Sequence, residues 1–306
     1  MMNKLLLPLI LVLFFAIISS AEWFDPSETA TDALTLGIGA IEGFADSAAA
    51  VFQNPAGLSK TKNLSLSTFR TTIMDDTVYS NAAVAFSSQW GRVGVGVVQL
   101  KASGIAHTGV DQYGEYECIS EVGYSNDIYY LSFAPDIKGY HIGYTIKYLS
   151  SDLGGLAGSA INADIGTYMT DFIYQGLDIS ALAKNVLTTS KYKYADGSSQ
   201  EIPMKILLSM EYELSERLQL YSQIRFIKKQ TPVNTCAIGV KYTPEFLPFM
   251  AVYSGWRELL IEDNKKDGIT CGVSIHYSNM ALSYAFERTE YILNNNNHYV
   301  SFSINY

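Results

Sequence analysis

The chain has 306 residues, is 48% hydrophobic and 13% aromatic, and carries a formal net charge of -9. Such an acidic chain has no basic footprint for nucleic acid and no basic patch for anionic lipid, so we expect no nucleic-acid partner. The 22 Tyr, 14 Phe and 23 Gly with only 8 Pro are typical of many strands with aromatic belts and tight turns, not of a helical bundle.

Residues 1–21 have the features of a cleaved secretory signal peptide. Met1 to Lys4 carry one positive charge, residues 5–18 are almost wholly apolar, and Ser19, Ser20 and Ala21 provide the small residues of a cleavage site. The alternative is a retained membrane anchor, but the apolar run of about 14 residues is shorter than the roughly 20 that a spanning helix needs. We therefore predict an exported protein.

Residues 22–60 form a segment without the alternation of strands. Small residues dominate its middle part, and Asn54-Pro55-Ala56-Gly57 is typical of a turn, because Asn is favoured before Pro and Gly tolerates positive φ. The segment is too long for a mere tether, and its small residues would let it pack closely inside a lumen.

From residue 61 to the C-terminus the chain divides into extended segments of roughly ten residues, the length that a tilted strand needs to cross the hydrocarbon layer. In the clearest of them, apolar residues such as Ile206 and Leu208 alternate with polar ones such as Lys205 and Ser209. This pattern predicts an all-β, transmembrane, antiparallel up-and-down β-barrel of about fourteen strands. The predicted strand cores are 62–71, 77–88, 91–101, 126–135, 139–150, 158–170, 173–185, 202–214, 217–229, 233–243, 248–258, 267–278, 279–290 and 297–306.

Charged and imidazole side chains on the polar strand faces are candidates for a polar lumen lining, because these groups need water or a partner. The alternative is that they line a water-filled or salt-bridged interior without any role in ligand passage. The candidates are His141, Lys147, Lys205, Glu211, Arg225, His276 and Glu287.

The lengths of the connections also favour an outer-membrane barrel, which has short periplasmic turns and longer external loops. Every second connection is short, for example at Gln89-Trp90 and Ser278-Asn279. Of the intervening connections, residues 102–125, 185–201, 259–266 and 291–296 form long or polar loops, and only those near Asp75-Asp76 and at 230–232 are short. An even strand number places both termini in the periplasm. Tyr306 would then end the strand that pairs with the first strand and closes the barrel.

The stretch LGIGAIEGFADSAAAVFQNPAGL, residues 36–58, resembles the N-terminal signature of the FadL long-chain fatty-acid transporters and their PorV/PorQ-like relatives. In those proteins a small-residue segment with an Asp leads into an Asn-Pro-Ala-Gly-Leu turn before the first strand. The resemblance implies a plug (hatch) inside the barrel, and hydrophobic ligands that pass through the interior to a lateral opening. By this resemblance the plug is shaped by Gly37, Gly39, Asp46, Asn54, Pro55 and Gly57.

Our leading functional hypothesis is passive uptake of hydrophobic or amphipathic, fatty-acid-like small molecules across an outer membrane, with membrane lipid and the ligand as partners. A PorV-like partner of a protein secretion system is the first alternative, with residues 102–125 and 185–201 as its docking surface. A general diffusion porin is the second, and it requires the N-terminal segment to leave the lumen open.

An enzyme is not expected, although outer-membrane barrels that hydrolyse lipids or peptides are known. His107, His141, His276 and His298 are available, but no sequence motif places a histidine beside a nucleophile and an orienting carboxylate. No His, Cys or carboxylate cluster has the spacing of metal ligands. We therefore expect no catalytic residues, no metal and no cofactor.

Overall fold

The computed structural model describes residues 29–73, 77–110, 113, 116–228, 233–261, 264–289 and 296–306. The predicted signal peptide and almost all of the predicted loop at 291–296 lie outside these residues. Within the described part of the chain, no helix combines the length and the apolar character needed to cross a membrane.

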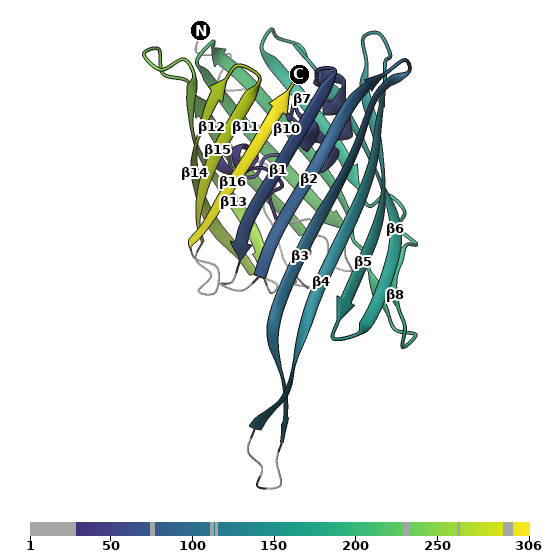
Figure 1. Ribbon diagram of the computed structural model, residues 1–306. Helices are drawn as coiled ribbons and strands as arrows, with labels where there is room; N and C mark the ends of the chain where they lie inside the picture. Colours follow the sequence, from purple (N-terminus) through teal and green to yellow (C-terminus); the bar gives the residue numbers. More distant parts are fainter. Residues whose placement is uncertain are drawn as a thin grey trace.

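The described strands form one antiparallel sheet of sixteen strands (Figure 1). Fourteen of them close into a barrel, which confirms the predicted fold and strand number. The barrel strands are β1 (Leu64–Ile73), β2 (Thr77–Ser88), β3 (Gly91–Val110), β4 (Tyr116–Pro135), β5 (His141–Leu153), β6 (Leu156–Met169), β7 (Leu177–Lys184), β10 (Met204–Ser215), β11 (Leu218–Lys228), β12 (Val233–Tyr242), β13 (Met250–Ile261), β14 (Asn264–Tyr277), β15 (Met280–Thr289) and β16 (Asn296–Asn305). The other two, β8 (Lys191–Tyr194) and β9 (Ser199–Glu201), form a small hairpin.

The first and last strands close the barrel. Leu66 pairs with Ile304 and Thr71 with Tyr299 in an antiparallel register. The amide of Leu64 donates to the carbonyl of Tyr306 at 2.9 Å, and the amide of Tyr306 donates back at 2.7 Å. The predicted role of the last strand is therefore confirmed, and this seam leaves no free sheet edge.

The alternation in the sequence appears as an inward and an outward face. Burial along β1 alternates strictly between exposed and buried residues. On β5, Ile146 is 60% exposed on the outer surface, whereas the next residue, Lys147, is 3% exposed on the inner surface. Apolar side chains thus form the outer band that a lipid-facing barrel requires.

The two ends of the barrel differ in their connections. At one end, which we call the short-turn end, the chain reverses at sites such as Gln89-Trp90 and Ser278-Asn279, and Tyr306 lies there as well. At the other, the long-hairpin end, β3 and β4 continue well beyond the barrel wall (Figure 1).

Two loop predictions and one strand prediction need correction. Residues 102–125, predicted as a polar loop, are mostly strand, because β3 and β4 stay paired out to Val110 and Tyr116 with two register shifts. Residues 259–266 are mostly strand as well, since β13 and β14 remain paired to Ile261 and Asn264. The predicted strand at 173–185 begins only at Leu177, after a turn with positive φ at Asp171 and Ile173.

The connection from β7 to β10 is long, as predicted, but it is not structureless. Its hairpin β8–β9 pairs with β6 through Gly158 and Tyr194. Tyr192 is 3% exposed and belongs to the apolar cluster of the barrel interior. The connection therefore folds against the wall instead of extending into solvent.

The segment before β1 lies inside the barrel, where Figure 1 shows its short helices near the short-turn end. They are α2 (Ala33–Gly37) and the 3-10 helices η2 (Ala48–Val51) and η3 (Pro55–Lys60). Leu36, Val51, Phe52 and Leu58 are at most 2% exposed and share one apolar cluster with the barrel wall. We call residues 29–60 the plug.

Candidate functional site

The plug rests on inward-facing glycines of the barrel wall. A Cβ on Gly96 of β3 would lie 2.6 Å from the ring of Phe52, and one on Gly143 of β5 would lie 2.2 Å from the backbone of Pro55. Gly94, Gly166, Gly239 and Gly255 make equally close approaches to the plug. Glycine weakens a strand interior, so its repeated use on the inner face is explained by the close approach of the plug, with its backbone at Gly143, Gly239 and Gly255 and its side chains at the other three.

Asn54 fixes the turn that begins η3. Its side chain caps the helix by accepting from the amide of Ala56 at 3.0 Å, and its Nδ2 donates to Thr167 O at 3.0 Å and to Ser180 Oγ at 2.8 Å. The residue is 1% exposed. One side chain thus stabilises the plug helix and joins the plug to β6 and β7.

The glycines of the plug itself allow tight packing. Gly39 has a φ of +87°, and both its amide and the carbonyl of Gly37 bind Thr270 Oγ1 of β14, at 3.1 and 3.2 Å. Gly57 is buried, and a Cβ there would lie 2.4 Å from the carbonyl oxygen of Ala45. Asp46, by contrast, is exposed on the plug surface.

An ion cluster connects the plug to the wall. The carboxylate of Glu42 pairs with Lys184 of β7 and lies 3.5 Å from the guanidinium of Arg225 of β11. The amide of Glu42 donates to Gln223 Oε1 at 2.8 Å. All three charged side chains are at most 13% exposed, so water screens their interaction weakly.

Two plug residues have pKa values displaced by their surroundings. Burial raises the pKa of Asp32, which caps α2 and also bonds Ser301 of β16. Burial lowers the pKa of Lys60, whose ammonium lies 3.6 Å from the centre of the Tyr168 ring and also contacts its hydroxyl.

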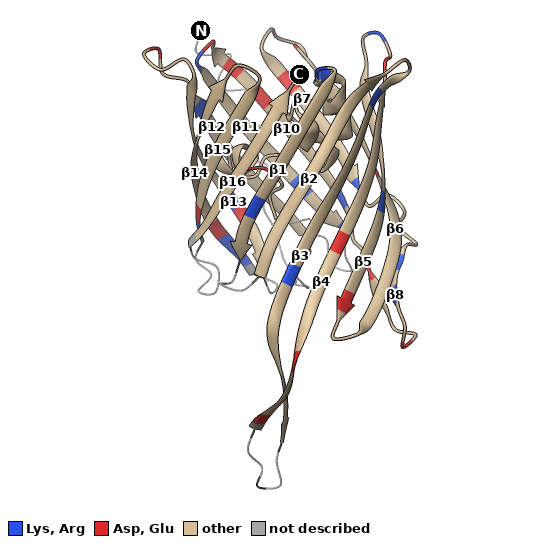
Figure 2. Cartoon of the chain, in the orientation of Figure 1, with Lys and Arg blue, Asp and Glu red and all other residues tan. Residues whose placement is uncertain are grey.

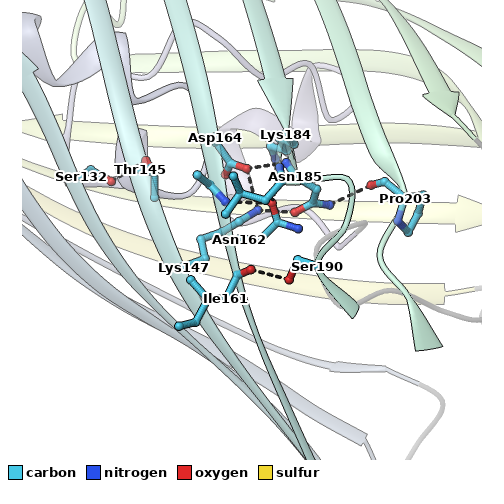
Figure 3. Close-up of polar contacts among 12 residues, drawn as sticks. Ser132, Thr145, Lys147, Ile161, Asn162, Asp164, Lys184, Asn185, Ser190 and Pro203 are labelled. Atoms are coloured by element: carbon cyan, nitrogen blue, oxygen red, sulfur yellow. Dashed lines mark hydrogen bonds and ion pairs between the residues drawn. The ribbon is translucent and has the colours of Figure 1, made fainter. Parts of the chain in front are cut away.

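A second polar cluster lies in the wall where β7 leaves the barrel (Figure 3). Lys147 Nζ binds Asp164 Oδ1 at 2.7 Å and Asn185 Oδ1 at 2.6 Å. The amide of Asn185 donates to the same Asp164 oxygen at 2.8 Å, and its side chain donates to Pro203 O at 3.0 Å. These bonds replace the ladder that β7 no longer offers to β6, so the cluster holds the wall together here.

A third cluster stabilises the opposite wall. Arg257 of β13 binds Glu287 of β15 through two parallel hydrogen bonds of 2.7 and 2.9 Å. The Tyr299 hydroxyl donates to the same carboxylate at 3.0 Å. The two charged side chains are 8% and 1% exposed, so the pair is isolated from water.

The remaining candidates for the lumen lining also occupy inward-facing positions. His141 Nδ1 lies 2.8 Å from Ser59 Oγ of the plug, and His276 Nε2 lies 2.8 Å from Ser274 Oγ. Glu211 accepts from the Tyr221 hydroxyl at 3.0 Å. Lys205 is 3% exposed and is the register partner of Lys184.

Towards the long-hairpin end, the interior over β16 and β1 to β5 has a large apolar and aromatic surface, interrupted by a few buried polar side chains such as Asn81 and Asn126. The ring of Phe69 stacks on Tyr299 and meets Tyr79 edge-on, with centroid distances of 5.9 and 5.7 Å. Further buried members of this lining are Val98, Leu100, Ile128, Tyr130 and Leu149. The ring of Phe52 meets Tyr130 at 5.1 Å, so the apolar lining is continuous with the plug.

The barrel is similar in fold to solved hydrocarbon channels. The CymD monoaromatic hydrocarbon channel gives a TM-score of 0.66 at 10% identity, over 90% of this chain and 98% of that one. A deltaS2 mutant of the TodX monoaromatic hydrocarbon channel gives 0.64 at 12% identity, over 92% of this chain and all of that one. The chain has the fold of the FadL-type outer-membrane barrels. Its sequence matches no protein-family model and no curated protein.

The barrel brings together residues that the sequence pattern did not single out. Glu42, Asp164, Lys184 and Arg257 complete the ion clusters around predicted residues. Asp164, Lys184 and Arg257 follow the same alternation as the predicted residues, so this signal could have found them. Which of these residues pair with one another depends on the strand register and on the position of the plug. The alternation of polar and apolar residues gives neither.

Proposed function

We propose that this protein is an outer-membrane channel for passive uptake of hydrophobic or amphipathic small molecules. The observation that carries the proposal is the continuity between the aromatic lining at Phe69, Tyr79 and Tyr299 and the plug, which lies towards the short-turn end. An apolar wall with few polar groups favours binding of apolar ligands over sugars or ions. The hydrocarbon channels CymD and TodX, which share the fold, support the same ligand class.

In this proposal residues 1–21 are removed on export, residues 22–60 form one N-terminal segment that includes the plug, and both termini face the periplasm. The long-hairpin end then faces outside, so a ligand meets the apolar lining before it meets the plug. Gly37, Gly39, Asn54, Pro55 and Gly57 set the seat of the plug, and Asp46 lies exposed on its surface. The seven lumen candidates stabilise the wall and the plug, and they limit water-filled space beside the ligand path.

The plug assignment is tested by single-channel conductance of refolded protein in planar bilayers, with the intact chain compared to one lacking residues 22–60. We expect a silent intact barrel and a conducting truncated one. A chain lacking residues 106–120 of the projecting hairpin is the matched control, because the deletion removes no barrel wall, and it should stay silent. Equal conductance of the intact and plug-free chains would instead indicate a general porin.

The ligand class is tested by uptake into cells without their own channel, with oleate and toluene as amphipathic and apolar probes. Expression of the intact chain should raise uptake of at least one probe above that of an unrelated porin. Uptake equal to the porin's for both probes would contradict the proposal.

A secretion partner is a second candidate because the β3–β4 hairpin projects beyond the barrel and carries acidic residues, among them Glu117 and Glu121 (Figure 2). A projecting acidic arm is suited to bind a basic exported protein. The hairpin deletion distinguishes the two functions, because it should leave probe uptake intact and abolish any docking of exported protein.

A further inference from the structure

A small basic surface lies on the outer face of β15, β16 and β1, three strands that are adjacent in Figure 1. Its members are Arg288, His298 and Arg70, one from each strand, and all three side chains are exposed. Overall acidity of the chain led us to expect no basic patch for anionic lipid, but net charge averages over a surface that is locally uneven.

The strand register places the three residues close together. Phe286 pairs with His298, and His298 lies across from Thr72 of β1, next to the Thr71 that pairs with Tyr299. His298 is therefore a diagonal neighbour of both Arg288 and Arg70, each two residues from its direct partner, at a distance of about 7–8 Å between backbones. The two arginines lie on opposite sides of His298, since Arg288 pairs with Asn296 and Arg70 with Val300, so their long side chains can both reach a ligand placed over the imidazole.

The arginines are available for a ligand. Within the described residues neither Arg70 nor Arg288 has a carboxylate at ion-pair distance, although Asp267 of β14 is a diagonal neighbour of Arg288. The nearby cation Lys265, by contrast, binds Glu258 at 3.1 Å. The strands β15, β16 and β1 thus carry two arginines on their described outer face that have no described ion-pair partner.

His298 adds a directed donor. Its Nδ1 lies 2.6 Å from the hydroxyl of Tyr284. When that hydroxyl donates to Nδ1, the ring proton lies on Nε2, which can then donate to an oxygen anion. Arg, His and Arg in this order form a row of donors for a phosphate group.

The surface next to the basic row is apolar. Leu66, Leu282 and Val300 continue the same three outer faces towards the short-turn end and are 38%, 50% and 48% exposed. A ligand that matches both surfaces has an anionic head and apolar chains. The boundary between the two surfaces marks the level of lipid headgroups, where cationic side chains reach out of the apolar band.

We propose that Arg70, Arg288 and His298 bind a phosphate of lipid A, the phosphorylated glycolipid of the outer leaflet, whose acyl chains lie along Leu66, Leu282 and Val300. The proposal rests on the proposed function in one respect, since it requires the long-hairpin end to face outside. Lipid A bound here would anchor the β1–β16 seam in the membrane.

The test is binding of diphosphoryl lipid A to the full-length protein in detergent, followed by native mass spectrometry. Dephosphorylated lipid A and phosphatidylglycerol are the ligand controls. The intact protein should prefer diphosphoryl lipid A over both. The variant Arg70→Gln/Arg288→Gln should weaken this binding about tenfold to thirtyfold, because each arginine contributes to attraction by an anionic lipid surface.

Two further variants separate charge at this site from charge in general and from misfolding. Lys101→Gln/Lys228→Gln removes two exposed cations from other strands at the same end and should change affinity less than about twofold. Arg70→Lys/Arg288→Lys keeps the charges and should retain most of the binding. The folded state of each variant is checked by its heat-modifiable electrophoretic mobility.

Three outcomes would overturn the proposal: equal affinity for phosphorylated and dephosphorylated lipid A, an equal loss in the Lys101/Lys228 control, or a lysine variant as weak as the glutamine variant. Phosphatidylglycerol bound as tightly as lipid A would show that the site recognises phospholipid instead. Failure of the channel proposal would appear in conductance and uptake, which this binding measurement does not involve.

Discussion

The backbone nitrogen of Gly39 in the plug lies where a side chain on Gly255 of β13 would begin, 2.2 Å from the position of its Cβ. Gly255 pairs with Gly239 of β12, which approaches the carbonyl of Ile38 equally closely. The two paired glycines thus leave a shallow depression in the wall, into which the plug backbone fits. Because Thr270 binds both Gly37 and Gly39, the plug is held at this place by hydrogen bonds as well as by shape.

Gly255→Ala should therefore displace the plug while the barrel still folds. The added methyl overlaps plug backbone and not a flexible side chain, so overpacking should cost about 1–3 kcal/mol at this contact. We expect openings in single-channel recordings of a barrel that is otherwise silent. Gly123→Ala is the control, because its nearest neighbour would be 3.7 Å away. A silent Gly255→Ala barrel would show that this contact does not keep the plug closed.

Glu42→Gln should loosen the plug by removing the charge between Lys184 and Arg225. Lys184 and Arg225 would then lie on either side of a neutral amide instead of a carboxylate. Breaking a buried ion pair by removing one partner typically costs about 3–5 kcal/mol. Hydrogen exchange of plug amides, measured by mass spectrometry, should become faster.

The matched control for Glu42→Gln is Glu201→Gln, which breaks the exposed pair with Lys191. Exposed pairs contribute little to stability, so plug exchange should not change. Equal plug protection in the wild type and Glu42→Gln would mean that apolar packing alone seats the plug.

The barrel was readable from the sequence because strand alternation and crossing length are local properties. Lys147 and Ile146 already identify the inner and outer faces of β5, and Tyr306 identifies the closing strand. The long hairpin was not predicted because residues 102–125 extend beyond the barrel wall. Strands there need no apolar outer face, and the sequence is polar. Without an apolar face, a polar two-stranded ribbon and a polar loop have similar sequence patterns.

The plug contacts were not readable for a different reason. Glycines within strands, such as Gly96 and Gly143, signal a close approach but do not identify the approaching segment. Glu42 pairs with two cations, one on each of two different strands, and only the folded barrel brings these two strands close to Glu42. The sequence therefore predicts which strand faces carry the polar clusters. The strand register and the position of the plug determine which residues form ion pairs.

Removing Glu287 should weaken the barrel itself. Glu287→Gln leaves the guanidinium of Arg257 buried without its bidentate carboxylate, which should cost about 3–5 kcal/mol of folding free energy. Urea unfolding of the barrel in lipid vesicles measures this loss. Glu245→Gln, which breaks the exposed pair with Arg217, should cost less than about 1 kcal/mol. A similar loss of folding free energy in both variants would show that the buried Arg257 pair contributes no more to stability than an exposed pair.

Asp32 should make the seating of the plug depend on pH. Burial, and to a lesser degree nearby Asp46, raises the pKa of Asp32, so the folded plug favours the neutral acid. Its contribution to stability is then fully present below the pKa of the unfolded chain and is lost as pH rises through the raised pKa of the folded state. Protection of the amides in α2 against hydrogen exchange, corrected for the intrinsic rate, should accordingly fall with rising pH.

Asp32→Asn should remove this dependence, because asparagine keeps the cap on the amide of Thr35 and carries no charge to bury. We expect protection in the variant to be nearly independent of pH and to exceed that of the wild type at neutral pH. Asp196→Asn, in an exposed turn far along the chain, serves as the control and should follow the wild type. If Asp32→Asn retained the full pH dependence, the titrating group would have to be another one in the plug, and Lys60, whose pKa burial lowers, would be tested next.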